Sequence, residues 1–269
     1  MAAAAAAFMS GEELVVTLAP VVVYWVYAGM YEVVLARTTV LDRYRLHSRR
    51  EEETKNIASR KDVVRGVLLQ QAIQAAISVA VIKLEGHGGG GTDGPAEPFL
   101  VVAARFGVAM LVLDAWQYFM HRLMHSVPYL YRRFHSWHHR VAAPYAYAAQ
   151  YGHPVDGVLT EVLSGAAAYL ASGMPPRAAA AFFAFATVKG VDDHCGVAAP
   201  WNPLHALFRN NTAYHDVHHQ RGGGRRNFSQ PFFVVWDRLL GTHAPYALRQ
   251  RDGGQGLEVK AFKDRQVVH

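Results

Sequence analysis

Long apolar stretches alternate with polar, basic segments along this chain of 269 residues. Three of these stretches cover residues 14–36, 66–82 and 99–120, and the second contains no formally charged side chain. A helix needs about 20 residues to cross a hydrocarbon core of about 30 Å, so the first and third are long enough to span a membrane and the second is marginal. The pattern predicts an all-α polytopic membrane protein with about three spanning helices.

Two shorter apolar stretches, 155–172 and 178–191, are separated by the turn signal Gly-Met-Pro-Pro at 173–176. The 14 residues of the second stretch reach only about 21 Å as a helix, which is too short to cross a bilayer unaided. We therefore expect a short helical hairpin that dips into the membrane or crosses where it is thinned. Two core helices of a soluble domain are the alternative.

Basic residues are distributed unevenly between the loops. Residues 37–65 contain nine Lys and Arg, whereas 85–98 contain none. By the positive-inside rule, the 37–65 loop is cytosolic and the glycine-rich 86–94 loop is on the opposite side, with the first stretch serving as an uncleaved anchor. These basic loops also account for the net charge of +6 without a nucleic-acid-binding function. The single cysteine, Cys195, excludes an intrachain disulfide and a cysteine-ligated metal site.

Three segments with distinct composition are expected. Residues 1–98 form an N-terminal membrane anchor with two spans, 99–245 form a catalytic domain, and 246–269 form a cytosolic C-terminal tail.

Eight of the fifteen histidines fall in three short boxes. The boxes are His121 and His125; His135, His138 and His139; and His215, His218 and His219. On a helix, residues three and four apart are neighbours about 5–6 Å apart, so each box is predicted to present its imidazoles on one face. The topology places all three boxes on the cytosolic side. Eight imidazoles exceed the four to six ligands of one first-row ion, which predicts a two-metal site in a cytosolic helical domain.

The residue types restrict the choice of metal but do not prove its identity. Imidazole suits zinc, iron, copper and nickel. No Glu lies inside any box, as a hydrolytic zinc site of the HExxH type would require. Histidines at a membrane edge can meet both dioxygen and a lipid chain, which favours redox-active iron that oxidises a C–H bond.

Five further residues are candidate members of the site. His194 closes the short apolar stretch and is expected to be an additional ligand, and His153, which opens the hairpin, is a candidate ligand or supporting residue. Ligating imidazoles usually donate their second N–H to an acceptor, and Asp114, Asp192 and Asp216 are candidate acceptors. Ion pairs with a nearby Arg are the alternative for these carboxylates.

In combination, the boxes resemble the superfamily of fatty acid hydroxylases and sterol desaturases, membrane enzymes with a non-haem di-iron centre. The resemblance covers roughly residues 100–245. Further matches are the stretches 114–122, 153–154, 193–196, 227–228 and 233–242. Within the superfamily, 24–31 and 151–154 look most like the plant sphinganine hydroxylases that act at carbon 4.

This resemblance implies residence in the endoplasmic reticulum and hydroxylation of sphinganine or dihydroceramide at carbon 4, as part of sphingolipid biosynthesis. It also implies two iron ions, dioxygen, and electrons from NADH that arrive through cytochrome b5 and its reductase in trans. Ceramide synthase is a further candidate partner. Arg221, Arg225 and Arg226 would suit an acidic donor, although a solvated loop explains them equally well.

Three alternatives stay open. A sterol methyl oxidase, sterol desaturase or aldehyde decarbonylase of the same superfamily would share the boxes. A histidine-rich membrane metal carrier should instead place its ligands along a path at the membrane midplane. A structural lipid-binding protein with vestigial boxes is disfavoured because all eight box histidines are intact.

Overall fold

The computed structural model describes residues 9–84, 97–220, 223–253 and 255–262. The glycine-rich segment 86–94 and Arg221 lie outside the described residues. In chain order the elements are α2 (Gly11–Arg37), η1 (Asp42–Tyr44), α3 (Arg49–Lys55), α4 (Arg60–Leu84), α5 (Phe99–Ser126), α6 (Pro128–Arg133), η2 (His135–Arg140), η3 (Ala146–Ala148), α7 (Pro154–Gly157), η4 (Val158–Val162), α8 (Leu163–Ser172), α9 (Pro176–His194), α10 (Pro203–Leu207), α11 (Thr212–His219), α12 (Val235–Leu239), β1 (Tyr246–Gln250) and β2 (Leu257–Ala261).

Three long helices match the three predicted spans. α2, α4 and α5 are each long and apolar enough to cross a membrane, which confirms the predicted class of a mostly helical, multi-span membrane protein. Ser10 caps the start of α2. Its hydroxyl accepts from the Glu13 N–H while the Glu13 side chain accepts from the Ser10 N–H, and this capping box satisfies two otherwise free amides. Each helix extends several residues beyond its apolar stretch, so α5 continues through the first histidine box.

One face of α2 is lined with exposed aliphatic side chains. These are Val15, Leu18, Val22, Val26, Met30 and Val33. They recur at intervals of three and four residues, and a continuous apolar stripe of this kind would be an aggregation site in water. The opposite face of α2 packs along α9. The exposed stripe therefore faces lipid.

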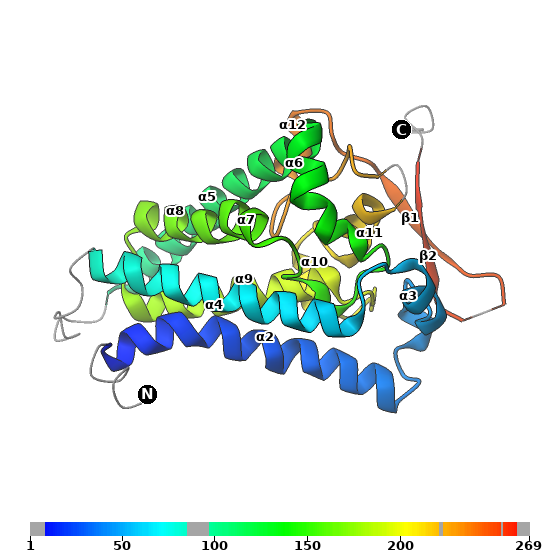
Figure 1. Ribbon diagram of the computed structural model, residues 1–269, viewed down its shortest axis with the longest axis horizontal. Helices are drawn as coiled ribbons and strands as arrows, with labels where there is room; N and C mark the ends of the chain where they lie inside the picture. The colour runs from blue at the N-terminus through cyan, green and yellow to red at the C-terminus, as the bar shows by residue number, and fades with distance from the viewer. Residues whose placement is uncertain (1–8, 85–96, 221–222, 254, 263–269) are drawn as a thin grey trace.

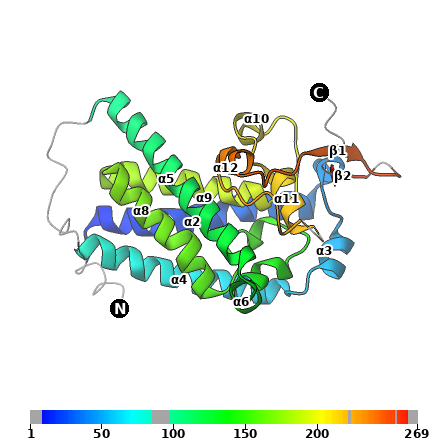
Figure 2. The same ribbon diagram turned by 90° about the horizontal axis from the view of Figure 1, so that it is seen from above.

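The predicted hairpin is present as α7, η4 and α8 in one arm and α9 in the other. Gly173, with φ of 58°, ends α8, and Pro176 opens α9 in the first-turn position where a missing N–H costs nothing. The arms diverge, because α8 packs on α5 while α9 packs on α2 (Figures 1 and 2). Whether this hairpin crosses the bilayer stays a prediction.

Some of the shorter elements lie beyond one end of the long helices, with α3, α11, β1 and β2 together at the right of Figure 1. β1 and β2 form an antiparallel pair in which Tyr246 faces Ala261. The loop after α2 joins this end, since the Leu46 N–H donates to the Gly196 carbonyl at 2.9 Å and the Leu257 N–H donates to the Arg45 carbonyl at 2.7 Å. The three predicted segments thus share contacts, and their division into domains stays a prediction.

The basic 37–65 loop lies on the same end of the molecule as the histidine boxes. The Ile57 N–H donates to the Arg140 carbonyl at 2.7 Å, beside the second box. Asn56 and Ala143 exchange two hydrogen bonds of 3.0 and 2.7 Å. His47 contacts Asp216 of the third box at 2.5 Å. The loop and the boxes therefore share one side, as the charge pattern predicts, while the identity of that side as cytosolic stays a prediction.

Candidate metal centre

Nine histidines converge into two adjacent groups at this end of the molecule. Within each group, one potential ligand atom per residue lies within 4.8 Å of all the others. Group one consists of His121, His125, His135, His139 and His218, and group two consists of His138, His194, His215 and His219. The groups touch, since the ring centroids of His139 and His219 are 4.8 Å apart. The structure thus brings together all eight box histidines and His194.

The second and third boxes divide their histidines between the groups, so the prediction that each box presents a single face is wrong for these two. Successive residues of an α-helix are about 100° apart, and successive residues of a 3₁₀ helix about 120° apart. The consecutive pair His218 and His219 of α11 therefore diverges, one ring to each group. The pair His138 and His139 of η2 does the same. Each HH pair bridges the two groups.

Hydrogen bonds fix the tautomer of six rings. The acceptors of Nδ1 are Phe228 O for His121 (2.9 Å), Tyr151 O for His138 (2.9 Å), Gly190 O for His194 (2.8 Å), Arg226 O for His218 (2.8 Å), Val141 O for His219 (3.0 Å) and Asp156 Oδ2 for His135 (2.7 Å). A carbonyl or carboxylate oxygen only accepts, so Nδ1 carries the proton in each ring. The six Nε2 atoms are consequently lone-pair donors available to a metal.

These lone pairs converge without protein partners of their own. The Nε2 atoms of His121, His135 and His194 are buried and make no hydrogen bond with any described residue. Other Nε2 atoms face each other, at 3.2 Å between His218 and His139 and at 3.0 Å between His219 and His215. At these two contacts His218 and His219 offer lone pairs, which are satisfied either by a proton on Nε2 of His139 or His215 or by a cation between the rings. The residues present therefore fit a metal centre.

The electrostatics of the groups favour the same conclusion. Burial lowers the pKa of His218 to about 3. Burial, followed by repulsion from neighbouring imidazoles, brings the pKa values of His139, His215 and His219 well below their ordinary range. Neutral imidazole is the ligating form, so protons compete little with a metal here at pH 7.

A loop after α11 presents two of the carbonyl acceptors. Asn227, with φ of 55°, donates to the Tyr214 carbonyl at 3.1 Å and accepts from the Ala244 N–H at 2.7 Å. The Asp237 carboxylate accepts from the N–H groups of Phe228 and Ser229 at 3.0 and 2.7 Å. These contacts hold the Phe228 carbonyl against His121. Two of the stretches that carry the family resemblance, 227–228 and 233–242, thus help to position His121.

Gly223 and Gly224, which precede this loop, lie close to other parts of the site. A Cβ on Gly223 would overlap the Val217 carbonyl oxygen, and one on Gly224 would lie 3.2 Å from the His125 ring. Only glycine allows the chain to pass this close to both.

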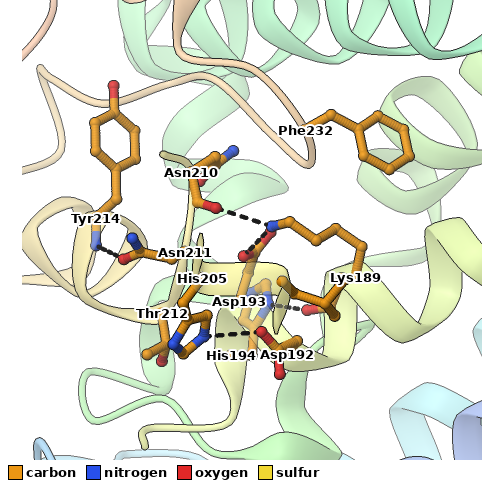
Figure 3. A network of polar contacts seen from close by, with 12 residues as sticks. Lys189, Asp192, Asp193, His194, His205, Asn210, Asn211, Thr212, Tyr214 and Phe232 are labelled. Carbon is orange, nitrogen blue, oxygen red and sulfur yellow. Dashed lines mark hydrogen bonds and ion pairs between the residues drawn. The ribbon is translucent and has the colours of Figure 1, made fainter. Parts of the chain in front are cut away.

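A polar network anchors the end of α9 that carries His194 (Figure 3). The fully buried Lys189 ammonium pairs with Asp193 and donates to the Asn210 carbonyl at 3.0 Å. Asn210 and its neighbour Asn211 precede α11, and the Asn211 side chain caps that helix by accepting from the Tyr214 N–H at 3.1 Å. The network therefore ties the segment of His194 to the helix of His215, two members of group two.

The three predicted carboxylate acceptors do not contact the grouped histidines. Asp114 accepts from the Phe232 and Phe233 N–H groups at 3.0 and 2.6 Å. Asp192 accepts from Tyr31 and Asn202 and pairs with His205 at 2.8 Å, while Asp216 pairs with His47. Each of these residues lies on a helix that carries a grouped histidine, but its carboxylate contacts a different element. The three carboxylates therefore stabilise the packing of the helices and do not orient the imidazole rings.

His153 belongs to neither group. Its Nδ1 accepts from the Val155 N–H at 3.2 Å and caps α7, and its ring lies against Phe134 and Trp137 with centroids 4.9 Å away. The ring of His153 therefore serves as the N-cap of α7, directly before Pro154. The carboxylate that does support a ligand, Asp156, was missed, because it lies 21 residues after His135 with no shared periodicity.

A cavity of about 210 Å³ opens at the histidines and extends between the long helices. His121, His135 and His194, whose Nε2 atoms lack partners, all line it. Apolar side chains line other parts, among them Val16, Ile77 and Ile82 of α2 and α4. The arrangement provides access for a long apolar molecule to the metal centre.

The fold and the site together define a helical membrane protein with a histidine-ligated, two-group metal centre at the end of an apolar cavity. Comparison with known proteins identifies the family: the fatty acid hydroxylase model matches residues 106–242, and the chain belongs to that family. No solved structure matches the chain.

Several relatives match nearly the full chain. The sequence is 51% identical to sphinganine C4-monooxygenase 1 of Arabidopsis thaliana over 96% of this chain and 98% of that protein. It is also 51% identical to a very-long-chain aldehyde decarbonylase of Oryza sativa subsp. indica, over 94% of this chain and 96% of that protein. A sphingolipid C4-hydroxylase of Schizosaccharomyces pombe is 36% identical over 85% of this chain and 87% of that protein.

Proposed function

We propose that this protein is a membrane monooxygenase that hydroxylates carbon 4 of sphinganine-type bases, free or in ceramide, and yields phytosphingosine-type bases. The observation that carries the proposal is the convergence of nine imidazoles at the head of a cavity with an apolar interior. Hydroxylation of an alkyl chain at a histidine-ligated metal centre requires these two features side by side. The balanced reaction consumes one dioxygen, two electrons and two protons, and releases one water.

Two iron ions, one per histidine group, would supply the redox chemistry that activates dioxygen toward an unactivated C–H bond. The protein residues have separate tasks. Histidines with protonated Nδ1 atoms keep their Nε2 lone pairs aimed at the metals, and the carbonyl acceptors prevent the rings from turning. The walls of the cavity exclude water and align an alkyl chain.

The carbon-4 specificity is supported by the distribution of names among the relatives. A sphinganine C4-monooxygenase of Arabidopsis thaliana is 51% identical to this chain, and sphingolipid C4-hydroxylases of Schizosaccharomyces pombe and Saccharomyces cerevisiae are 36% and 37% identical. Action at carbon 4 is named for both the plant and the fungal relatives, which favours that activity for this chain. The aldehyde decarbonylase name, carried by rice relatives of equal identity, is the second candidate.

The electron donor and the location complete the proposal. Electrons would come from NADH through cytochrome b5 and its reductase, and the protein would reside in the endoplasmic reticulum with its boxes facing the cytosol. The exposed Arg225, beside the loop that supports His218, would suit an acidic donor surface. Ceramide synthase would be a further partner.

Product analysis tests the activity and separates the two candidates. The chain is expressed in cells that lack sphingoid-base hydroxylation, under ¹⁸O-labelled dioxygen. We expect trihydroxy bases with one labelled oxygen. Unlabelled trihydroxy bases, or alkanes one carbon shorter than a supplied aldehyde with no trihydroxy base, would overturn the assignment. The same cells carrying the His218→Ala variant are the control.

A further inference from the structure

A cluster of polar side chains interrupts the apolar wall of the cavity near the histidines. Gln70 and Gln74 of α4 line it, one helical turn apart, and Glu161 of η4 lines it from another wall. Further along the same face of α4 the lining residues are Ile77, Ser78, Val81 and Ile82. One face of a single helix therefore changes from amides to mainly aliphatic side chains with distance from the histidine end.

Gln70 is buried with its hydrogen-bonding capacity unused. Only 2% of the residue is exposed, and neither its Oε1 nor its Nε2 bonds to any described residue. The neighbouring Gln71 differs, since it accepts from Trp25 Nε1 at 2.8 Å and donates to Gln150 Oε1 at 2.9 Å. A buried amide without partners destabilises the folded protein, because it has lost its hydrogen bonds to water. Gln70 thus retains a cost that a polar ligand in the cavity would remove.

Gln70 reaches the segment that supports the metal ligands. A Cβ on Gly157 would overlap the Gln70 amide, so glycine at that position leaves the space that the amide occupies. The preceding residue, Asp156, accepts from His135 at 2.7 Å. The unused amide therefore lies beside the carboxylate that holds a group-one ligand.

Glu161 brings a carboxyl group to the same cavity. Its side chain makes no ion pair and accepts no hydrogen bond from the described residues, although it is only partly exposed. It follows Asp156 by five residues, about 7–8 Å along a helix axis. It also lies on η4, a π-helical turn, and such turns recur at functional sites.

A carboxyl group and amides that line one cavity with an aliphatic wall match a molecule with a cationic, hydroxylated head and an alkyl chain. The carboxylate pairs with a cation in a low-dielectric cavity, the amides bond to hydroxyls, and the aliphatic wall covers an alkyl chain. A free sphingoid base has an ammonium on carbon 2 flanked by hydroxyls on carbons 1 and 3. Carbon 4 is adjacent to this head, so residues that bind the head near the histidines also set which carbon meets the metals.

We propose that Gln70, Gln74 and Glu161 form a head-group subsite that selects the free, protonated long-chain base over its N-acylated form. This inference rests on the proposed carbon-4 hydroxylation. Acylation replaces the ammonium by a neutral amide and adds a second chain. Glu161 then has no cation to pair with, and the subsite loses its strongest contact.

The test compares two substrates in membranes that contain the full-length protein and its reductase system. Sphinganine and N-acylsphinganine are supplied separately, and kcat/KM is measured for each. The wild-type protein should prefer sphinganine. The Glu161→Gln change should lower kcat/KM for sphinganine about 10- to 100-fold, as expected for a lost charged hydrogen bond, and change that for N-acylsphinganine less than about threefold. Glu161→Asp, which keeps the carboxylate, should retain part of the preference.

The matched control is Gln71→Leu, which removes the adjacent buried amide whose partners are Trp25 and Gln150. It should lower the yield of folded protein and leave the ratio of the two kcat/KM values unchanged. A binding readout without turnover follows the melting temperature of the detergent-purified protein. Sphinganine should raise it more than N-acetylsphinganine does, and Glu161→Gln should remove the difference.

The outcomes separate the two proposals. If neither substrate yields a trihydroxy base, carbon-4 hydroxylation is wrong. If hydroxylation occurs but the wild-type protein prefers N-acylsphinganine, or Glu161→Gln lowers both kcat/KM values equally, the subsite assignment is wrong while the activity stands. A melting shift that is equal for both ligands overturns the subsite as well.

Discussion

The contact between His135 and Asp156 provides the sharpest test of the metal centre. It is the one carboxylate acceptor among the six Nδ1 contacts resolved for the grouped histidines, with a distance of 2.7 Å and side chains only 5% and 6% exposed. Asp156→Asn keeps an acceptor oxygen of the same shape and removes the charge. His135 then resembles the five rings that rest on neutral carbonyls.

Changes to supporting residues of this kind typically cost 10- to 100-fold in metal affinity, or about 1.4–2.8 kcal/mol. We expect the loss of metal affinity in Asp156→Asn to be about 10-fold, since a hydrogen bond to His135 survives. Asp156→Ala should lie near the upper limit, because it leaves a buried N–H without an acceptor.

The assay is metal competition against a graded series of chelators, with purified protein and no substrate, so that any effect on substrate binding is excluded. The melting temperature of the metal-free protein reports folding separately. The control is Asp216→Asn, which alters an equally buried carboxylate whose partner, His47, belongs to neither group. Equal metal affinity in wild type and Asp156→Ala, or a larger loss in Asp216→Asn, would refute the reasoning.

Three further predictions follow from the same geometry. The purified protein should hold about two metal ions per chain, one per group of four or five imidazoles, and His138→Ala and His218→Ala should each abolish activity while the helix content stays unchanged; a single ion bound only by His121 and His125 would contradict this. Cysteine labelling in sealed microsomes should place residue 50 and the boxes on the cytosolic face and residue 90 on the other, whereas labelling of 90 and 135 from one side would overturn the topology. The metal-free protein should lose stability as pH falls from 7.5 to 5.5: burial lowers the pKa of His218 to about 3, so below an unfolded value of about 6.5 the unfolded chain binds protons that the folded chain does not. Thermal denaturation after chelation measures this loss, and a midpoint that rises toward pH 5.5 would show that the sign is wrong.

Much of the architecture could be predicted from the sequence because its signals are local. A span is recognised from its own length and apolarity, and α2, α4 and α5 contain the three predicted stretches, 14–36, 66–82 and 99–120. The hairpin followed from the Gly-Pro signal at 173–176. The direction in which its arms pack could not be predicted, since α8 and α9 meet helices from distant parts of the chain.

The sequence by itself determined the ligand chemistry: imidazoles at helical spacing, in numbers too large for one ion, in a membrane protein. Only the tertiary structure decided how those imidazoles divide into two groups, because consecutive rings on a helix diverge and each follows its nearest partners from other elements. The tertiary structure also decided which groups accept hydrogen bonds from the imidazole rings. The carbonyl that holds His121 lies 107 residues away in the chain, and a backbone carbonyl leaves no signature in a sequence. The cavity, with Gln70 unpaired beside Gly157, likewise exists only once α4 meets η4.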